Sequence, residues 1–411
     1  MKRIYLEFVR GTAAVIVLIY HCIELHPTNG PNHYYFSNWG TDAVIIFFIL
    51  SGVVINMSQT LNPKFRRTFL INRLIRLYPQ FIVGLVLGLS ALYITKTAMP
   101  SIGAIMGNFL MLSTLKEHMG YIASCIESNS PIWSLSFEVF FYLLFVLAMG
   151  RYQKKAVLVW FLISLMVFPL YYFKVEHNVV GHIIAVLAFS STWLIGYYVY
   201  EYRNYFYADK YTALFSAGAL PLISRLHLSG HYYDPIKYLL FAVFAIPFFR
   251  YCLQIPPGGK KINLFYMVVP YLIIIYAVFM QPYITFLNFI LYSALPVGFM
   301  LACFIIVIFK LKKPCLSFIS KAGDLLGKYS YSLYISHYPV LFVCAVFFHN
   351  SAIYLLVSLP CIFLITFCLE SFLQPMVVKY FGKLRTEKSG MAYKLNTPVF
   401  NPTHSTTQSI N

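Results

Sequence analysis

A guanidinium and an imidazole side chain lie within the first long apolar stretch of the chain. Arg10 and His21 stand eleven residues apart, about three helical turns, so one helix would carry both on nearly the same face, roughly 16 Å apart along its axis. A charge at membrane depth costs roughly 2.5–3.5 kcal/mol on insertion scales and invites a functional interpretation. Alone, Arg10 fits a charge that reaches the membrane surface, and His21 fits a hydrogen bond between helices. Imidazole also serves as a general base or a nucleophile, and we interpret both residues as catalytic candidates.

Four arginines follow the second apolar stretch: Arg66, Arg67, Arg73 and Arg76. Arg73 and Arg76 are three residues apart, on one face of a helix that leads back into the membrane. Their number fits charge that sets topology. Their position at the membrane edge favours bidentate recognition of phosphate, and we predict an anion-binding site.

A carboxylate inside an apolar stretch is a third signal. Glu138 follows Trp133 and Ser136 at the expected outer end of a later stretch. Trp133 also suits an aromatic belt at the membrane interface. His337 lies about two turns inside another stretch, on its cytoplasmic side. Asp42 lies at the outer end of a stretch, where it is either solvated or functional, and Glu24 lies near the outer interface, where we expect it to be solvated. Glu370, at the end of the last stretch, is expected to reach the surface or the lysines of the tail.

A helical membrane bundle must position these side chains. The 411 residues are 60% hydrophobic and only 11% charged, against about a quarter charged in soluble domains. This composition excludes disordered, coiled-coil, collagen-like and ordinary cytosolic proteins, and long continuous apolar blocks argue against a β-barrel. We expect an all-α, polytopic transmembrane helical bundle of 10–12 spans. The blocks are 8–25, 41–58, 80–95, 134–149, 156–173, 181–200, 211–226, 236–250, 264–280, 286–309, 331–349 and 352–372, with a weaker, interfacial or re-entrant one at 102–115.

The net charge of +18 would suggest nucleic acid in a soluble protein, but here it follows topology. With twelve spans and the N-terminus inside, 26 of the 31 Lys and Arg residues fall on the inner side. The outer side holds five: Lys96, Lys116, Lys174, Arg225 and Lys237. Both termini are therefore expected to be cytoplasmic, with no nucleic-acid partner. Residues 1–380 form the expected membrane domain, and 381–411 a polar, disordered tail.

Neither cysteine nor histidine spacing predicts a metal site. The eight cysteines include no CxxC pair and mostly lie in or beside apolar blocks, where a free Cys behaves as a small hydrophobe. The small residues Ser51 and Gly52 suit close approach of another helix, and we predict a packing role for both.

Five segments in order resemble the integral-membrane acyltransferase-3 family, which O-acylates bacterial surface carbohydrates. Each is weak alone, but together they run from residue 10 to residue 339. They are Arg10 with His21; residues 47–52 (Phe-Phe-Ile-Leu-Ser-Gly); residues 73–79, similar to Arg-x-x-Arg-x-x-Pro; residues 133–138, matching Trp-Ser-Leu-x-x-Glu; and residues 330–339, matching Ser-Tyr-Ser-x-Tyr-x-x-His-x-Pro.

The sequence also departs from the family pattern. Members often carry an acid just before the Phe pair and Phe after the Gly, where this chain has Ile45 or Ile46 and Val53. Members commonly have about ten spans. Some add a soluble esterase-like domain, and any such partner here would be a separate extracytoplasmic protein.

The resemblance implies transfer of an acyl group, preferentially acetyl, from cytoplasmic acyl-CoA to a hydroxyl of a surface polysaccharide or its lipid-linked precursor. The expected location is the inner membrane of a bacterium. Acetyl-CoA would be the donor, held by Arg66, Arg67, Arg73, Arg76 and His337. His21, Arg10 and Glu138 would be catalytic, with Glu138 orienting His21 or binding the acceptor. Trp133, Ser136 and Asp42 would bind the acceptor substrate. A flippase or proton-coupled carrier using His21, Glu138 and His337 is the rival interpretation, and a scaffold would leave the embedded ionisable residues unexplained.

Overall fold

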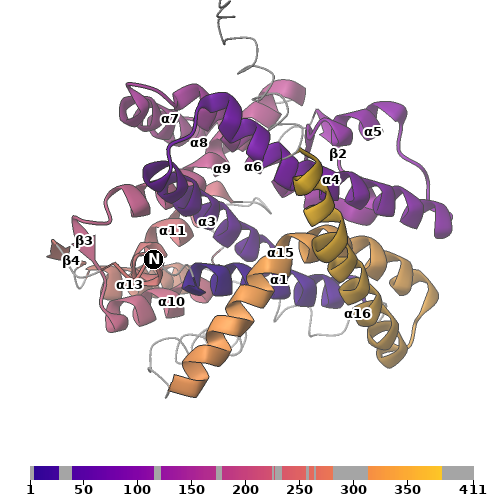
Figure 1. Ribbon diagram of the computed structural model, residues 1–411. Helices are drawn as coiled ribbons and strands as arrows, with labels where there is room; N and C mark the ends of the chain where they lie inside the picture. Colours follow the sequence, from indigo (N-terminus) through magenta and orange to yellow (C-terminus); the bar gives the residue numbers. More distant parts are fainter. Residues whose placement is uncertain are drawn as a thin grey trace, which may run out of the picture.

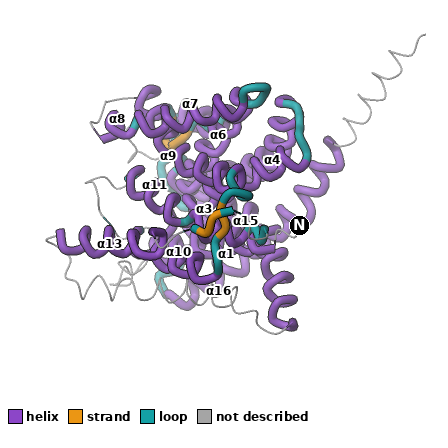
Figure 2. Tube along the Cα trace, turned by 90° about the vertical axis from the view of Figure 1, so that its left-hand side faces the viewer, coloured by secondary structure: helices purple, strands orange, loops and turns teal. Residues whose placement is uncertain are grey.

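Helices make up nearly all of the structure, a computed structural model that describes residues 4–26, 39–114, 122–172, 178–224, 226, 234–255, 259–262, 265–280 and 313–381. Figures 1 and 2 show these helices and the few short strands between them. The expected all-α class is therefore confirmed. The expected tail, beyond Phe381, and the apolar block at 286–309 lie outside the described residues.

The long helices come in chain order. They are α1 (Ile4–Glu24), α3 (Trp39–Leu61), α4 (Arg66–Ile94), α6 (Trp133–Ala148), α7 (Gln153–Met166), α9 (Asn178–Glu201), α15 (Lys313–Phe347) and α16 (Ser351–Cys368), which continues into a π-helical turn, η2 (Leu369–Leu373). The shorter helices are α5 (Ile102–Phe109), the 3₁₀ segment η1 (Glu127–Ile132), α8 (Phe168–Tyr172), α10 (Lys210–Ile223), α11 (Pro235–Phe244), α12 (Ile246–Cys252) and α13 (Phe265–Met280). Two parallel pairs of two-residue strands join loops: β1 (Ser113–Thr114) with β2 (Ala123–Ser124), and β3 (Phe206–Tyr207) with β4 (Lys260–Lys261).

Eight helical stretches in the described ranges are long and apolar enough to cross a membrane, or nine if α11 and α12, bent by 45° at their junction, count as one span. The sequence predicted 10–12. The block at 211–226 forms α10, of 14 residues, and the block at 264–280 forms α13, of 16 residues, so both are shorter than a typical span. The weak block at 102–115 divides into α5 and the start of a loop carrying β1.

Helix α1 lies at the centre of the site region, packed along α15 and α3. Figure 1 shows α15 (orange) beside α1 (indigo), with α16 on the other side of α15. The outward face of α16 exposes large apolar side chains, among them Leu356, Phe363 and Leu364, as expected of a surface that faces lipid.

Glycine allows α3 and α9 to touch through their backbones. A Cβ on Gly52 would lie 2.0 Å from the carbonyl oxygen of Trp193, and a Cβ on Gly196 would lie 2.1 Å from that of Ile49. No side chain fits at either place, which is the small-residue packing common between membrane helices. The predicted packing role of Gly52 is confirmed.

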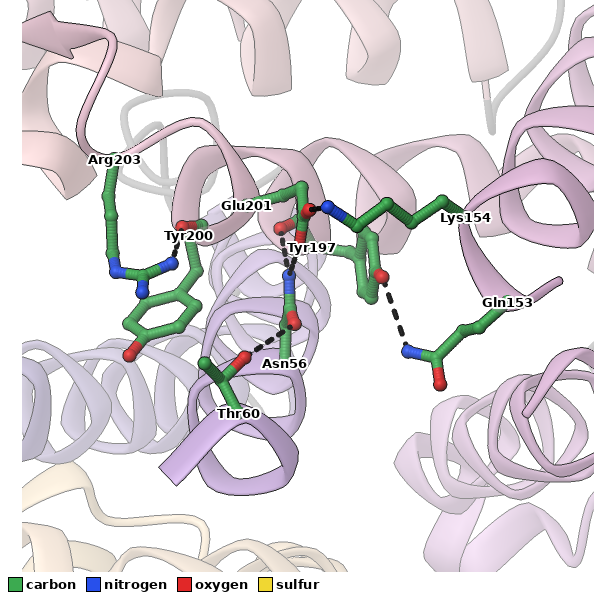
Figure 3. Close-up of polar contacts among 8 residues, drawn as sticks. All are labelled: Asn56, Thr60, Gln153, Lys154, Tyr197, Tyr200, Glu201 and Arg203. Carbon is green, nitrogen blue, oxygen red and sulfur yellow. Dashed lines mark hydrogen bonds and ion pairs between the residues drawn. The ribbon is translucent and has the colours of Figure 1, made fainter. Parts of the chain in front are cut away.

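A polar cluster ties one end of α3 to α7 and α9 (Figure 3). The buried Asn56 side chain donates to the Tyr197 carbonyl oxygen at 2.9 Å and to Glu201 Oε2 at 3.3 Å. Lys154 Nζ pairs with Glu201 Oε1 at 2.7 Å. The cluster fixes this end of α3. Ile55 and Ser58, close to Asn56 on the same helix, line a cavity described below.

Candidate functional site

Two cavities lie at opposite ends of the α1 segment that runs from Glu7 to Glu24. The first, the histidine cavity, has a volume of about 660 Å³ and is lined by Tyr20, His21 and Glu24 among others. The second, the arginine cavity, has a volume of about 200 Å³, and Glu7 and Arg10 contribute to its wall. The eleven residues between Arg10 and His21 separate the two by roughly 16 Å along the helix.

Several elements run from one cavity to the other. Helix α3 contributes Gly40 and Thr41 to the histidine cavity and Ser51 to the arginine cavity. Helix α4 runs the other way, from its arginines to Leu92. The segment η1–α6 and helix α15 likewise line both. Both cavities are therefore lined by the same elements: α1, α3, α4, the η1–α6 segment and α15.

In the histidine cavity, the His21 ring is held by a carboxylate on its own helix. Nδ1 of His21 lies 2.6 Å from Oε2 of Glu24, and Tyr20 donates its hydroxyl to the other carboxylate oxygen, Oε1, at 3.1 Å. The edge of the Tyr338 ring packs against His21 at a centroid distance of 4.9 Å. The ring is thus fixed, and Nε2 is the nitrogen left for chemistry.

His337 lies behind this pair. Its ring centroid is 5.3 Å from that of His21, and it is buried without lining the cavity itself. Nδ1 of His337 lies 3.1 Å from the Leu333 carbonyl oxygen. The sequence placed His337 on the donor side with the arginines, whereas the structure places it beside His21.

Three arginines line the second cavity. Arg10 pairs with Glu7 at 2.5 Å, and the Arg73 guanidinium lies over the rings of Phe69 and Tyr142, at 5.3 and 5.6 Å from their centroids. Arg76 completes the set. The three guanidinium groups share this small cavity with the carboxylates of Glu7 and Glu138, a set whose net positive charge suits an anion.

Glu138 belongs to the arginine cavity. It accepts the hydroxyl of Tyr142, which also lies 3.3 Å from Ser51 Oγ. The sequence expected Glu138 to lie in the outer half, where it would orient His21 or bind an acceptor. The structure instead gives His21 the carboxylate of Glu24.

The other two arginines of the cluster do different things. Arg66 donates Nε to the Met149 carbonyl oxygen at 2.9 Å and so holds the turn after α6. Arg67 is exposed and lines neither the histidine cavity nor the arginine cavity. Of the four arginines predicted to bind the donor, the structure brings only Arg73 and Arg76 to the cavity.

The predicted acceptor residues also separate. Trp133 lines the histidine cavity. Ser136 is buried, with its hydroxyl 3.2 Å from that of Ser113, and lines neither cavity. Asp42 is buried and accepts the hydroxyl of Ser224, so it braces α3 against the end of α10, while its neighbours Gly40 and Thr41 line the cavity.

Two carboxylates were missed by the sequence interpretation. Glu24 was assigned to the wet interface, although its position three residues after His21 on a helix is a signal for a side-chain pair. Glu370 was expected to reach the surface or the tail. Glu370 instead lies within the π-helical turn η2, and its Oε2 accepts from Ser332 at 2.8 Å and from Gln80 at 3.2 Å, inside the bundle.

Tyr334 lies between the two cavities. Among the described residues, it is the one that lines both. Its hydroxyl contacts Ser134 Oγ at 2.7 Å and the Pro131 carbonyl oxygen at 2.5 Å, so it is fastened to the junction of η1 and α6.

The comparison with protein families matches an acyltransferase domain over residues 3–373, nearly the whole chain. The chain belongs to the acyltransferase-3 family. Membership implies acyltransferase activity in a multi-pass membrane protein, and the match spans both cavities. Comparisons with curated proteins and with solved structures found no match to this chain.

Proposed function

We propose that this acyltransferase-3 protein moves an acyl group, preferentially acetyl, from acyl-CoA to a hydroxyl of a cell-surface polysaccharide or its lipid-linked precursor. The observation that carries the proposal is the pair of cavities around α1. One presents three arginines suited to a polyanionic donor, and the other presents a histidine–carboxylate pair suited to proton transfer from an alcohol.

The donor enters from the arginine side. Arg10, Arg73 and Arg76 bind phosphate groups by charge-assisted hydrogen bonds. Pockets that enclose a drug-sized ligand measure about 300–1,000 Å³, and the arginine cavity, at about 200 Å³, is smaller. It therefore takes part of the donor, with the rest of the nucleotide outside. The long pantetheine arm carries the thioester toward His21. The excess of basic residues on one side supports a cytoplasmic position for this cavity.

The acceptor occupies the histidine cavity. Aromatic side chains at its wall, Tyr20, Trp133 and Tyr338, suit the apolar faces of sugar rings, while Glu24 and Glu127 offer carboxylates to hydroxyl groups. At about 660 Å³ the cavity falls within the range of ligand pockets, about 300–1,000 Å³. With this cavity on the outer side, as the proposal requires, the acceptor would be a carbohydrate displayed outside a bacterial inner membrane.

In the transfer step, Nε2 of His21 takes the proton of the acceptor hydroxyl. The oxygen attacks the thioester carbonyl, the new C–O bond forms, the C–S bond breaks, and the CoA sulfur receives the proton from His21. Glu24 holds Nδ1 and stabilises the imidazolium, as the carboxylate of a catalytic triad does. In the alternative course His21 first carries the acyl group itself and the acceptor then removes it.

The test reconstitutes the purified protein in liposomes with labelled acetyl-CoA and a surface-glycan acceptor. We expect label in the glycan with wild type and with His349→Ala, an exposed histidine outside both cavities, and none with His21→Ala. Equal labelling by wild type and His21→Ala would remove the catalytic role of His21. Solute crossing the bilayer without consumption of acyl-CoA would favour a carrier instead. If brief exposure to the donor leaves the labelled acyl group attached to His21, the two-step course is favoured.

A further inference from the structure

Tyr334 lies between the two cavities. It contributes to the wall of both, although its side chain is only 5% exposed. One of its hydroxyl contacts, Ser134, lines the arginine cavity, and the other, Pro131, lines the histidine cavity. The hydrogen-bonded residues Tyr334, Ser134 and Pro131 therefore include wall residues of both cavities.

Neighbouring rings hold the Tyr334 ring in this place. Phe47, on the arginine-cavity wall, packs edge-on at a centroid distance of 5.9 Å, and His337, one turn later on α15, lies at 5.9 Å. The hydroxyl cannot turn away without breaking two hydrogen bonds, and the ring cannot shift without displacing its aromatic neighbours. Both restraints keep the Tyr334 ring between the two cavities.

We propose that Tyr334 is the partition between donor and acceptor cavities and that its ring decides which acyl groups reach His21. In this proposal the thioester comes to rest beside the ring, where the remaining space suits a two-carbon acyl group and not the extra carbons of a longer chain. The inference rests on the proposed function for its substrate, because acyl length has meaning only if a thioester enters from the arginine side. The partition itself has a test that needs no turnover.

That test measures access to Cys125, which lines the histidine cavity. Full-length protein in sealed liposomes is exposed to a charged, membrane-impermeant thiol reagent from the side of the arginine cavity, and peptide mass spectrometry quantifies modification at Cys125. We compare wild type with Tyr334→Leu, which removes the ring, and Tyr334→Phe, which keeps it. Tyr329→Leu is the matched control, because Tyr329 lies on the same helix and lines neither cavity.

We expect slow modification in wild type, Tyr334→Phe and Tyr329→Leu, and modification about tenfold faster in Tyr334→Leu, since thiol reactivity follows access. Equal rates in wild type and Tyr334→Leu overturn the partition. If Tyr334→Leu does not fold, Tyr334→Val makes the same comparison with another side chain that lacks the ring.

The second arm compares acetyl-CoA with octanoyl-CoA as donors. We expect Tyr334→Leu to raise the octanoyl-to-acetyl ratio of kcat/KM by about tenfold or more, the scale on which a pocket discriminates chain length, and Tyr334→Phe to leave the ratio unchanged. If wild type uses no acyl-CoA at all, the proposed function fails while the Cys125 result still decides the partition. If wild type is active and Tyr334→Leu keeps the wild-type ratio, the role of Tyr334 in selecting the acyl group is wrong.

Discussion

Nδ1 of His21 and Oε2 of Glu24 lie 2.6 Å apart, one turn from each other on α1, so the candidate base and the group that orients it come from a single helix. Because both side chains come from the same backbone, one helix sets their spacing. Tyr338 of α15 packs against the His21 ring, so the neighbouring helix also helps to hold the pair at the histidine cavity.

Replacing Glu24 by Gln should lower kcat by about 100-fold, within the range that a positioned acid–base group contributes, with the donor KM little changed. The amide keeps the shape of the side chain but cannot stabilise the imidazolium. Steady-state kinetics with acetyl-CoA measure both constants. Glu127→Gln removes a second carboxylate of the same cavity, which is proposed to contact acceptor hydroxyls, and should raise the acceptor KM with kcat near wild type. A similar fall of kcat in both variants would mean that the charge of the cavity, not the His21–Glu24 pair, matters.

Replacing Arg73 by Gln should raise the donor KM by about tenfold or more, because a hydrogen bond to a charged group is worth about 1.5–3 kcal/mol. Arg73→Lys should recover only part of the loss, as an ammonium lacks the planar fork and stacks less well on Phe69 and Tyr142. Arg67→Gln, at an exposed arginine of the same helix that lines neither cavity, should leave KM near wild type. An unchanged KM in Arg73→Gln contradicts donor binding at this wall.

Gly52→Ala should destabilise the protein by about 1–3 kcal/mol, the usual cost of overpacking. The new Cβ would lie 2.0 Å from the Trp193 carbonyl oxygen, so α3 and α9 would have to separate. Thermal unfolding in detergent, followed by size-exclusion chromatography, measures the effect. Gly103→Ala is the control, because its nearest atom would be Ser101 Oγ at 3.9 Å. Unfolding temperatures that match in both variants would show that the two helices are not held at backbone contact.

Asp209 provides a pH-dependent contact outside the candidate spans. Burial opposes ionisation of its carboxylate, but hydrogen bonds from Lys261 and Thr212 outweigh burial and hold the pKa of Asp209 below its usual range. A carboxylate with a depressed folded-state pKa stabilises the protein above its unfolded pKa, near 4, and loses that effect as pH falls through the lower folded value.

Asp209→Asn isolates this charge, because Asn caps helices about as well as Asp does and α10 begins next to it. The variant should melt at a slightly lower temperature than wild type at pH 7, and this difference should shrink as the pH falls below about 4. Melting curves across this pH range make the comparison. A difference that does not shrink with falling pH would assign the effect to the cap and not to the ion pair.

The family and the helical class could be read from the sequence because both depend on residue order and composition. Arg10 and His21 were placed correctly relative to each other, since one helix fixes their separation. Glu138 and His337 were assigned to the wrong neighbours because their positions were counted from the ends of the apolar blocks. Their candidate spans begin earlier, at Glu127 and Lys321, so each residue lies further along its span than the block boundaries suggested.

Contacts between helices far apart in the chain could not be predicted from the sequence, for a different reason. Glu370 meets Ser332 and Gln80 only because η2, α15 and α4 converge, and a single apolar stretch does not reveal which face turns inward. Tyr334 likewise belongs to a recognisable segment, but its place between two cavities depends on η1, α6 and α3 together.

The two cavities at opposite ends of α1 also bear on the electrical insulation of the membrane. A bilayer core is about 30 Å thick, and Tyr334 lies in the thinner layer of protein that separates the two hollows. A potential of 100 mV is worth about 2.3 kcal/mol for each elementary charge that crosses it. Where water fills both hollows, the potential falls mainly across that layer, so a proton or thiolate that crosses it does most of the electrical work there and not over the whole membrane.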